Sequence, residues 1–424
     1  RLRHSPDPFA RPFPLVWGVS SFVLLTALLA VSIKQDGTRL LTSCSPDANV
    51  VATLPQGAPV EVRFSLAGEL GACYKVATPQ GLAGYVPQSA VSGTEDLDRA
   101  RAAAGDIGLP QMMRNEQARV REQITTGRVP VTAALQKGLA MLETNRARQA
   151  LAHFEEALDK TPPSAGLLAL AGMAAFQSDQ PRKAVAYWRE SLALEPNPGI
   201  AQMKLRAERE LAHDRSGDRS AGTYFTLRYD GAQVSGVSAS DLVQVLDEEY
   251  SRIRGVLGCQ PREKIIAIVQ SPDAYRASTA ASEWSGGQFD GRIRIPVPDA
   301  NQRISAATRR VFAHEIVHAC IAQIGRFPVW FHEGLAQRLS GDYAGPEGRR
   351  WVSAMLREDK LPPLENLSGG WATMNTVQAM AAYRYTLVAA EFLFEELGEG
   401  RVRAALAQPD SLTDLARDLS SRLR

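Results

Sequence analysis

The pattern H-E-x-x-H at residues 314–318 constrains the fold of this chain more than any other segment. Two histidines four residues apart project from one face of an α-helix, where both imidazoles can bind one zinc ion. The carboxylate of Glu315 lies between them, where it can take a proton from a water molecule at the metal. Since only six histidines occur in the chain, the motif predicts a metal-binding helix within residues 304–324. A zinc helix that has lost its activity satisfies the same pattern.

A tetrahedral zinc ion needs a third protein ligand besides the two histidines and a water molecule. The extended pattern H-E-x-x-H-x-x-G-x-x-H is excluded, because Ile321 and Ile324 stand where it requires glycine and histidine. His332 and Glu333 follow at the start of a second predicted helix, residues 330–339. Glu333 is the better candidate, because it can face the first helix while the preceding side chain points about 100° away.

Composition limits the classes of partner and the role of the cysteines. Charged residues make up 22% of the chain and the net charge is +2, with both signs mixed along the sequence, so no nucleic-acid partner is predicted. The absence of a C-x-x-C motif argues against a zinc ribbon or a redox motif. Two disulfides, with Cys44 and Cys73 as the favoured pair because they share one small domain, and four buried free thiols are both consistent with the sequence.

Residues 15–33 form an uncharged apolar run, close to the ~20 residues needed to cross a bilayer. We therefore expect a single transmembrane helix there. Arginines within residues 1–14 place that segment in the cytoplasm by the positive-inside rule. The expected location is a bacterial inner (cytoplasmic) membrane, with the catalytic domain periplasmic or extracellular. A cleaved signal peptide is the competing interpretation, because Ala30 offers a small residue near the end of the run.

Residues 37–93 read as short strands separated by turns, such as Val60 to Phe64 after the turn at Gly57. The segments Gly57 to Val62, Tyr74 to Ala77 and Gly84-Tyr85-Val86 resemble the bacterial Src-homology-3-like domain, although its tryptophans are absent. The resemblance implies a small all-β barrel that contacts cell-wall peptides. A spacer barrel without a ligand is the alternative.

An internal repeat of 34 residues follows a charged, Ala-rich segment, 94–130, that we interpret as a helical linker. Gly138, Ala150, Phe154 and Pro162 recur as Gly172, Ala184, Trp188 and Pro196. In this pattern glycine lets paired helices approach, the aromatic residue fills the groove between them, and proline ends the second helix. The spacing resembles two tetratricopeptide repeats, with a closing helix at residues 199–213. They form either a docking surface for a protein partner or a rigid arm.

The last domain is expected to begin near Gly222, after a linker at residues 215–221, and to alternate strands and helices before becoming helical. The strand from Gly286 to Val297 should lie at a sheet edge, since Pro296 cannot donate to a central ladder. The expected organisation is a multidomain chain: 1–14 cytoplasmic N-terminus, 15–33 transmembrane helix, 37–93 small all-β barrel, 94–130 helical linker, 131–213 α-helical tetratricopeptide repeats, and 222–424 α+β zincin-like catalytic domain.

The H-E-x-x-H motif together with Trp330-Phe331-His332-Glu333-Gly334-Leu335-Ala336 resembles the gluzincin metallopeptidases, whose second motif is W-x-x-E-G-x-A. The closest family is the peptidase-MA-like domain of bacterial envelope proteins, whose G-x-x-D-G-x-I-x-V strand is matched by residues 287–295 with a final isoleucine. The resemblance implies that His314, His318 and Glu333 bind Zn2+ and that Glu315 is the general base. It also implies a phenol that stabilises the oxyanion; Tyr385 aligns best, and Tyr383 remains open.

These observations predict a membrane-anchored zinc metallopeptidase that hydrolyses peptide bonds in envelope or extracytoplasmic proteins. Its partners would be a peptide or protein substrate, with further contacts through the repeats, the barrel and the membrane helix. The alternative is an envelope scaffold that binds the cell wall or proteins and carries a structural or inactive zinc site. A zinc hydrolase that acts on a non-peptide amide in the cell wall is a third interpretation.

Overall fold

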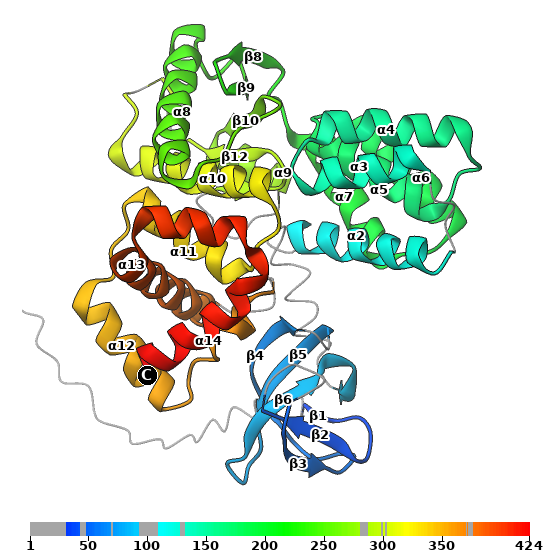
Figure 1. The fold of residues 1–424 in the computed structure, drawn as a ribbon. Coiled ribbons are helices and arrows are strands. Elements are labelled where there is room, and N and C mark those ends of the chain that lie inside the picture. Colours follow the sequence, from blue (N-terminus) through cyan, green and yellow to red (C-terminus); the bar gives the residue numbers. More distant parts are fainter. Residues whose placement is uncertain are drawn as a thin grey trace, which may run out of the picture.

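The computed structural model describes residues 31–42, 48–68, 71–92, 109–127, 132–279, 287–297, 300–301, 303–369, 371 and 376–424. Over these residues the chain is mostly helical and contains two five-stranded sheets and one two-stranded sheet. Figure 1 shows three bodies: a small sheet region, a block of helices, and a larger body that holds the second five-stranded sheet and the remaining helices.

The first body is all-β but open. It contains β1 (Ser32–Ile33), β2 (Thr38–Leu41), β3 (Val50–Leu54), β4 (Glu61–Gly68), β5 (Gly71–Ala77), β6 (Ala83–Pro87), the 3-10 helix η1 (Gln88–Ala90) and β7 (Val91–Ser92). The five-stranded sheet has the order β3-β2-β6-β5-β4, and β1 pairs with β7. The predicted closed barrel is therefore wrong, because no pairing between described strands joins the edges β3 and β4.

Tyr85 on β6 joins this sheet to the largest body. Its side chain is 1% exposed and contacts Asn366 in the 3-10 helix η3 (Leu364–Leu367). β4 packs on the same helix. The aromatic residue of the Gly84-Tyr85-Val86 motif is thus buried at an interface within the chain, which favours the spacer interpretation of this region.

The block of helices contains the expected repeat. Its members are α3 (Ala133–Glu143), α4 (Ala147–Lys160), α5 (Ala165–Gln177), α6 (Pro181–Leu194) and α7 (Pro198–His213). A side chain at Gly138 would collide with the ring of Phe154, and one at Gly172 would collide with Trp188. The predicted packing of the repeated glycine and aromatic positions is therefore confirmed.

Helix α2 (Leu109–Thr125) is a packed element rather than a linker. It lies against α5, the first helix of the second repeat, and against the closing helix α7, as Figure 1 shows. Leu109, Met113 and Val120 are at most 2% exposed and belong to the core of the repeats. This helix therefore covers a face of the repeats that the docking interpretation needs to be accessible.

The second five-stranded sheet lies in the largest body. It comprises β8 (Asp218–Ala221), β9 (Phe225–Tyr229), β10 (Ile265–Gln270), β11 (Gln288–Phe289) and β12 (Ile293–Pro296), with α8 (Gly236–Leu257) and α9 (Pro272–Thr279) in the connections. The order is β11-β12-β10-β9-β8, with the central three strands parallel and both edges antiparallel.

Two local predictions about this sheet are wrong. The linker expected at residues 215–221 contains the edge strand β8. The edge expected at residues 286–297 is β11 alone, because β12 lies between β11 and β10. Pro296, the last residue of β12, is tolerated in an internal strand because the next residue supplies the bond to β10: the Val297 amide donates to the Gln270 carbonyl at 2.8 Å.

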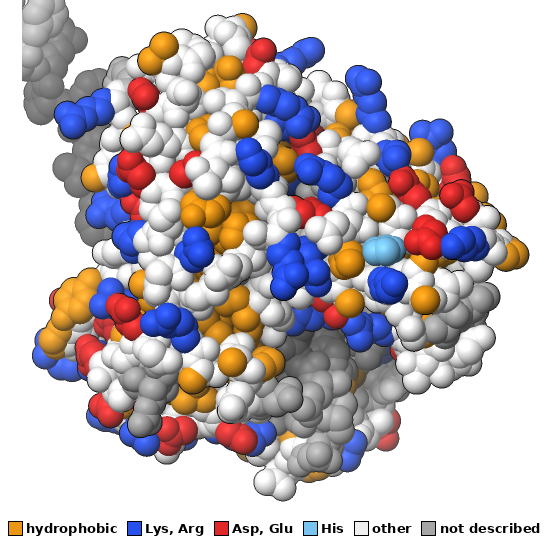
Figure 2. All heavy atoms as spheres, turned by 45° about the horizontal axis from the view of Figure 1, so that its top comes forward, with side chains coloured by type: hydrophobic (Ala, Val, Ile, Leu, Met, Phe, Trp, Pro, Cys, Tyr) orange, Lys and Arg blue, Asp and Glu red, His pale blue; other side chains and the backbone are white. Residues whose placement is uncertain are grey.

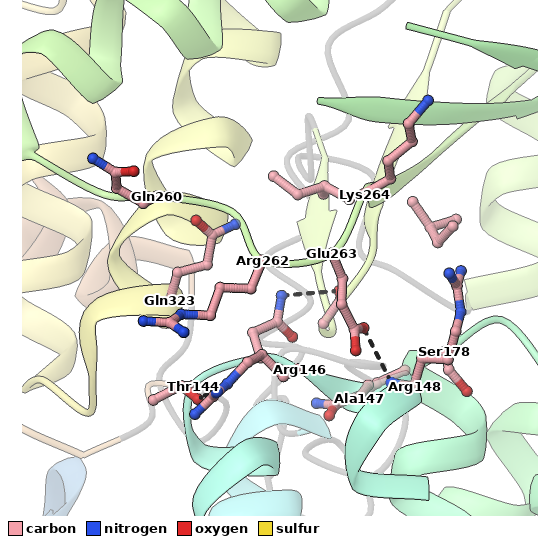
Figure 3. A pocket seen from close by; sticks show the side chains of 15 residues that line it. Thr144, Arg146, Ala147, Arg148, Ser178, Gln260, Arg262, Glu263, Lys264 and Gln323 are labelled. Atoms are coloured by element: carbon pink, nitrogen blue, oxygen red, sulfur yellow. Dashed lines mark hydrogen bonds between the residues drawn. The ribbon is translucent and has the colours of Figure 1, made fainter. Parts of the chain in front are cut away.

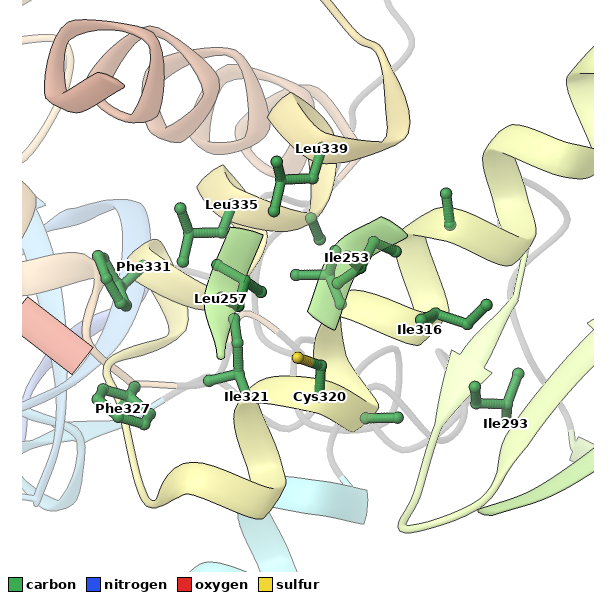
Figure 4. Packing of buried hydrophobic residues seen from close by; sticks show 14 of the residues in the cluster. Ile253, Leu257, Ile293, Ile316, Cys320, Ile321, Phe327, Phe331, Leu335 and Leu339 are labelled. Atoms are coloured by element: carbon green, nitrogen blue, oxygen red, sulfur yellow. The ribbon is translucent and has the colours of Figure 1, made fainter. Parts of the chain in front are cut away.

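The rest of this body is helical, and Figure 4 shows its core. The elements are α10 (Ala306–Ile324), α11 (Val329–Ser340), α12 (Gly345–Arg357), η3, α13 (Thr376–Ala407), the 3-10 helix η4 (Pro409–Ser411) and α14 (Leu412–Leu423). Ile253 from α8, Ile316 from α10 and Leu335 from α11 meet in this core with no exposed surface. Each such side chain contributes about 1.5–3 kcal/mol on burial, so these three helices are held together mainly by apolar packing.

The structure corrects the prediction of a single-pass membrane protein. No helix among the described residues is both long enough and apolar enough to cross a membrane. Residues 15–30 of the expected anchor lie outside the described residues, as do residues 1–14. The last two residues of the expected anchor, Ser32 and Ile33, form strand β1. Hydrogen bonding of β1 to β7 places these two residues in a sheet instead of a helix.

The cysteines are oxidised wherever the structure describes them. Cys259, just after α8, is bonded to Cys320 on α10, and Cys73 is also disulfide-bonded. Its expected partner, Cys44, lies outside the described residues. The interpretation as four free thiols is therefore wrong. The bond between Cys259 and Cys320 ties α8 to the helix that carries the H-E-x-x-H motif.

The surface carries mixed charges. On the face that Figure 2 draws, Lys and Arg side chains alternate with Asp and Glu, and apolar side chains lie between them. This distribution matches the small net charge of +2.

Candidate metal centre

Two helices and a close helix crossing build the candidate metal centre. Helix α10 begins where the Ser305 hydroxyl accepts a hydrogen bond from the Thr308 amide at 3.0 Å. The chain turns after Ile324 and enters α11 next to Pro328. Gly334 lets α11 lie against α13, because a Cβ there would be 2.5 Å from the Thr386 carbonyl oxygen. This crossing brings the start of α11 between α10 and α13.

The structure brings the three predicted ligands together. Nε2 of His314 lies 3.5 Å from Oε2 of Glu333, and Nε2 of His318 lies 3.6 Å from the same oxygen. All three potential ligand atoms lie within 4.8 Å of one another. The side chains are 22%, 12% and 16% exposed respectively, so each candidate ligand is partly buried.

The chemistry of this cluster fits zinc. Nitrogen and oxygen ligands about 2.0–2.2 Å from one tetrahedral ion are about 3.4 Å apart, close to the separations found here. Oε2 of Glu333 is buried and has no hydrogen-bond partner among the described residues. A buried carboxylate oxygen without a partner is costly, and it points at the space between the two histidines. A cation bound by all three side chains would satisfy it.

The protonation of the three side chains suits a cation, with one exception. Burial lowers the pKa of His318 to about 4, so this imidazole is neutral. Burial raises the pKa of Glu333, but the nearby histidines outweigh it and hold the pKa below 4.5, so the carboxylate is ionised. Burial lowers the pKa of His314, but the Glu333 and Glu315 carboxylates together outweigh burial and raise it above 6.5. A cation at this site therefore competes with a proton for His314.

Glu315 is buried beside the cluster with the properties of a base. Its side chain is 5% exposed, and burial is the main reason that its pKa rises to about 7. Gly287, just before β11, lies against this carboxylate, because a Cβ at Gly287 would be 2.7 Å from Oε1 of Glu315. A carboxyl group with a pKa near neutrality can accept and return a proton under ordinary conditions.

The two tyrosines on α13 occupy different surroundings. Tyr383 forms a side-chain hydrogen bond with Glu333, and burial raises its pKa well above 10, so the phenol keeps its proton. Tyr385 is fully buried, and its hydroxyl lies 3.2 Å from the Ser420 hydroxyl on α14. The structure therefore brings Tyr383, and not Tyr385, to the cluster. Alignment of the motif favoured Tyr385 and left Tyr383 open. Residues two apart on a helix face different directions, so the motif alone could not choose between them.

Two more residues near the cluster are relevant. The ring of His332 stacks on His318 with 5.7 Å between centroids, and burial lowers its pKa to about 3. His332 is therefore a neutral neighbour of a ligand. Arg114, on α2, adds a positive charge that lowers the pKa of both histidines further. No pattern in the sequence connects Arg114 with residues more than two hundred positions later.

A polar cavity of about 150 Å³ lies elsewhere, where the repeats meet the segment 260–266 (Figure 3). The Glu263 carboxylate accepts hydrogen bonds from the Arg148 amide at 3.1 Å and the Gln149 amide at 2.9 Å. Glu263 thus caps the N-terminus of α4 and links the two bodies. None of the candidate ligands lines this cavity.

No protein-family model, no curated protein and no solved structure matches this chain. Its function therefore has to be inferred from the chemistry of the candidate metal centre.

Proposed function

We propose that this chain is a zinc-dependent metallopeptidase of the gluzincin type that hydrolyses peptide bonds in a peptide or protein substrate. The observation that carries the proposal is the convergence of His314, His318 and Glu333 from two helices on one small volume. The two motifs resemble those of gluzincins, and the general base and a phenol expected in that family lie beside the same cluster.

Each side chain of the cluster would have a separate role in hydrolysis. His314, His318 and Glu333 would hold zinc, which lowers the pKa of bound water toward about 7 and polarises a carbonyl group. Glu315 would accept a proton at its carboxylate and later return it to the leaving amine. Tyr383 would keep its phenolic proton and donate a hydrogen bond where negative charge develops on the substrate.

The test combines metal analysis with hydrolysis. The purified chain should bind about one zinc ion and cleave an unfolded protein substrate. Glu315→Gln should keep the zinc and lower kcat by about 100- to 10,000-fold, because the amide cannot take a proton. Hydrolysis at an undiminished rate in Glu315→Gln would disprove the assigned role. Absence of zinc binding by the wild type would disprove the metal centre.

The scaffold alternative receives less support from the contacts. Tyr85 of the β region is buried against Asn366, and α2 covers a face of the repeats. Both accessory regions thus direct surfaces toward other parts of the chain. A scaffold would bind a partner equally well with His314→Ala and His318→Ala, whereas a peptidase would lose hydrolysis in both variants.

A further inference from the structure

A buried ionic cluster joins the repeats to the sheet beside the candidate metal centre. Each of its side chains is at most 12% exposed. Four guanidinium groups face four carboxylates, so the charges balance. The members are Asp179, Arg206, Glu210 and Asp214 from the repeats and their end, and Arg228, Asp290, Arg292 and Arg294 from the sheet.

Glu210 on α7 is the centre of this ionic cluster. Its two carboxylate oxygens accept hydrogen bonds from Nη1 and Nη2 of Arg292, both at 3.0 Å. Arg294 donates to the same carboxylate at 2.5 Å. Asp290 accepts from Nε of Arg292 at 3.3 Å and Nε of Arg294 at 3.2 Å. Paired, forked contacts of this kind fix both distance and orientation.

Removing one carboxylate from this ionic cluster would leave a buried positive charge without compensation, which a protein interior tolerates poorly. The three arginines hold the pKa of Glu210 well below its ordinary value despite burial, so the charge is present near neutrality. Phe176 on α5 adds a second contact from the repeats, with its ring centre 4.0 Å from the Arg292 guanidinium.

The same hairpin reaches Glu315 at its other end. Arg292 and Arg294 lie on one side of the β12 segment, since residues two apart in a strand share a face. β12 pairs with β11 through Gln288 opposite Arg294. Gly287, next to β11, contacts the Glu315 carboxylate. A shift of the guanidinium groups relative to α7 would therefore move the backbone that touches Glu315.

We propose that Glu210 is a positioning residue that holds the β11–β12 hairpin against Glu315 through Arg292 and Arg294. The helical repeats thereby contribute to the geometry of the hydrolytic site. The effect on hydrolysis rests on the proposed function. The effect on the hairpin does not, because it follows from the contacts alone.

The experiment uses the full chain with Glu210→Gln, which removes the charge and keeps the size. Glu208→Gln is the matched control, because Glu208 lies on the same helix and pairs only with Lys204 in its described contacts, at 40% exposure. Arg294→Lys is a milder variant that keeps the positive charge but loses the planar guanidinium group that contacts two carboxylates at once. Each protein is compared by amide hydrogen exchange, zinc content, kcat and KM.

Glu210→Gln should accelerate exchange in the peptide 287–294 by about tenfold and leave α14 unchanged. It should retain zinc and lower kcat by about 10- to 100-fold with a similar KM, because the base is misplaced and not removed. Glu208→Gln should behave as the wild type.

Unchanged exchange in the hairpin, or equal acceleration in α14, would overturn the positioning role. If Glu210→Gln does not fold, Arg294→Lys decides by the same measurements. If the wild type neither binds zinc nor hydrolyses peptides, the proposed function fails, and exchange in the hairpin still decides the positioning role.

Discussion

At the scale of single residues, burial and neighbouring charges shift the pKa values of the candidate metal centre in different directions. Burial is the main reason that the pKa of Glu315 rises to about 7 and that of His318 falls to about 4. The same environment favours a neutral ligand and a base that is half-protonated near neutrality. In Glu333, by contrast, neighbouring histidines overcome burial and keep the carboxylate charged. Two carboxylates of one cluster thus have pKa values shifted in opposite directions.

The phenol near the cluster can be assigned by substitution. Tyr383→Phe should lower kcat about 100-fold while zinc content stays the same, because it removes a hydrogen-bond donor beside Glu333. Tyr385→Phe should mainly reduce stability, since its hydroxyl pairs with Ser420. Steady-state kinetics and thermal melting separate the two effects. A loss of kcat confined to Tyr385→Phe would contradict the assignment.

The third ligand can be assigned by metal analysis. Glu333→Ala should abolish tight zinc binding, because it removes the oxygen that lies 3.5 and 3.6 Å from the two histidine nitrogens. His332→Ala should retain about one zinc ion per chain, because this ring stacks on His318 without joining the cluster. If zinc is lost only in His332→Ala, His332 and not Glu333 is the third ligand.

At the scale of elements, the candidate metal centre depends on how three helices approach one another. α10 carries two of the candidate ligands, α11 carries the third, and α13 carries Tyr383. Gln337 on α11 donates to the Tyr383 carbonyl at 2.9 Å and to the Thr386 hydroxyl at 3.1 Å, which ties α11 to α13. The disulfide at Cys320 holds the other side of α10. A change in the distances between these three helices would therefore disturb the candidate metal centre.

A single methyl group at the helix crossing tests this dependence. Gly334→Ala should destabilise the chain by about 1–3 kcal/mol and weaken zinc binding, because the added Cβ would meet the Thr386 carbonyl oxygen at 2.5 Å. Gly236→Ala on α8 is the control, because no atom lies within 4 Å of its added Cβ. Denaturant unfolding and zinc titration provide the readouts. Equal unfolding free energies and equal zinc affinities in the two variants would show that the helix crossing can accommodate the added methyl group.

At the scale of the whole molecule, the accessory regions are joined to the body that carries the candidate metal centre by several separate contacts. Tyr85 contacts η3, Glu263 caps α4, and the ionic cluster around Glu210 joins α7 to the β11–β12 hairpin. A boundary drawn at Gly222 would separate Glu210 from Arg292. The catalytic unit that we propose therefore extends back into the repeats.

Acid should loosen this joint. The pKa values of Glu210 and Asp290 lie below their ordinary 4.5 and 3.8 because three arginines outweigh burial. Groups with lowered pKa values in the folded state add stability above those ordinary values, and this stability is lost as the pH falls through the folded-state values. Urea unfolding at several pH values below 4.5 should show the loss. The pH dependence should be weaker in Glu210→Gln, and equal steepness in both proteins would contradict the explanation.

The sequence by itself determined the local features. The two motifs predicted the helices α10 and α11, the segment 286–297 was predicted to hold a strand, and the 34-residue period predicted the contacts of Gly138 and Gly172. Motif spacing also predicted that His314, His318 and Glu333 would meet, because an i,i+4 pair and a following helix start are local properties.

Only the tertiary structure decided what distant segments do to one another. The open sheet, the packed α2, the choice between Tyr383 and Tyr385, and the ionic cluster around Glu210 all depend on contacts between residues far apart in the chain. Such contacts leave no periodic pattern, since a buried arginine or tyrosine reads the same in sequence as a solvated one. The physical reason is that burial and partner choice are properties of the packed chain, whereas helix and strand periods are properties of its local geometry.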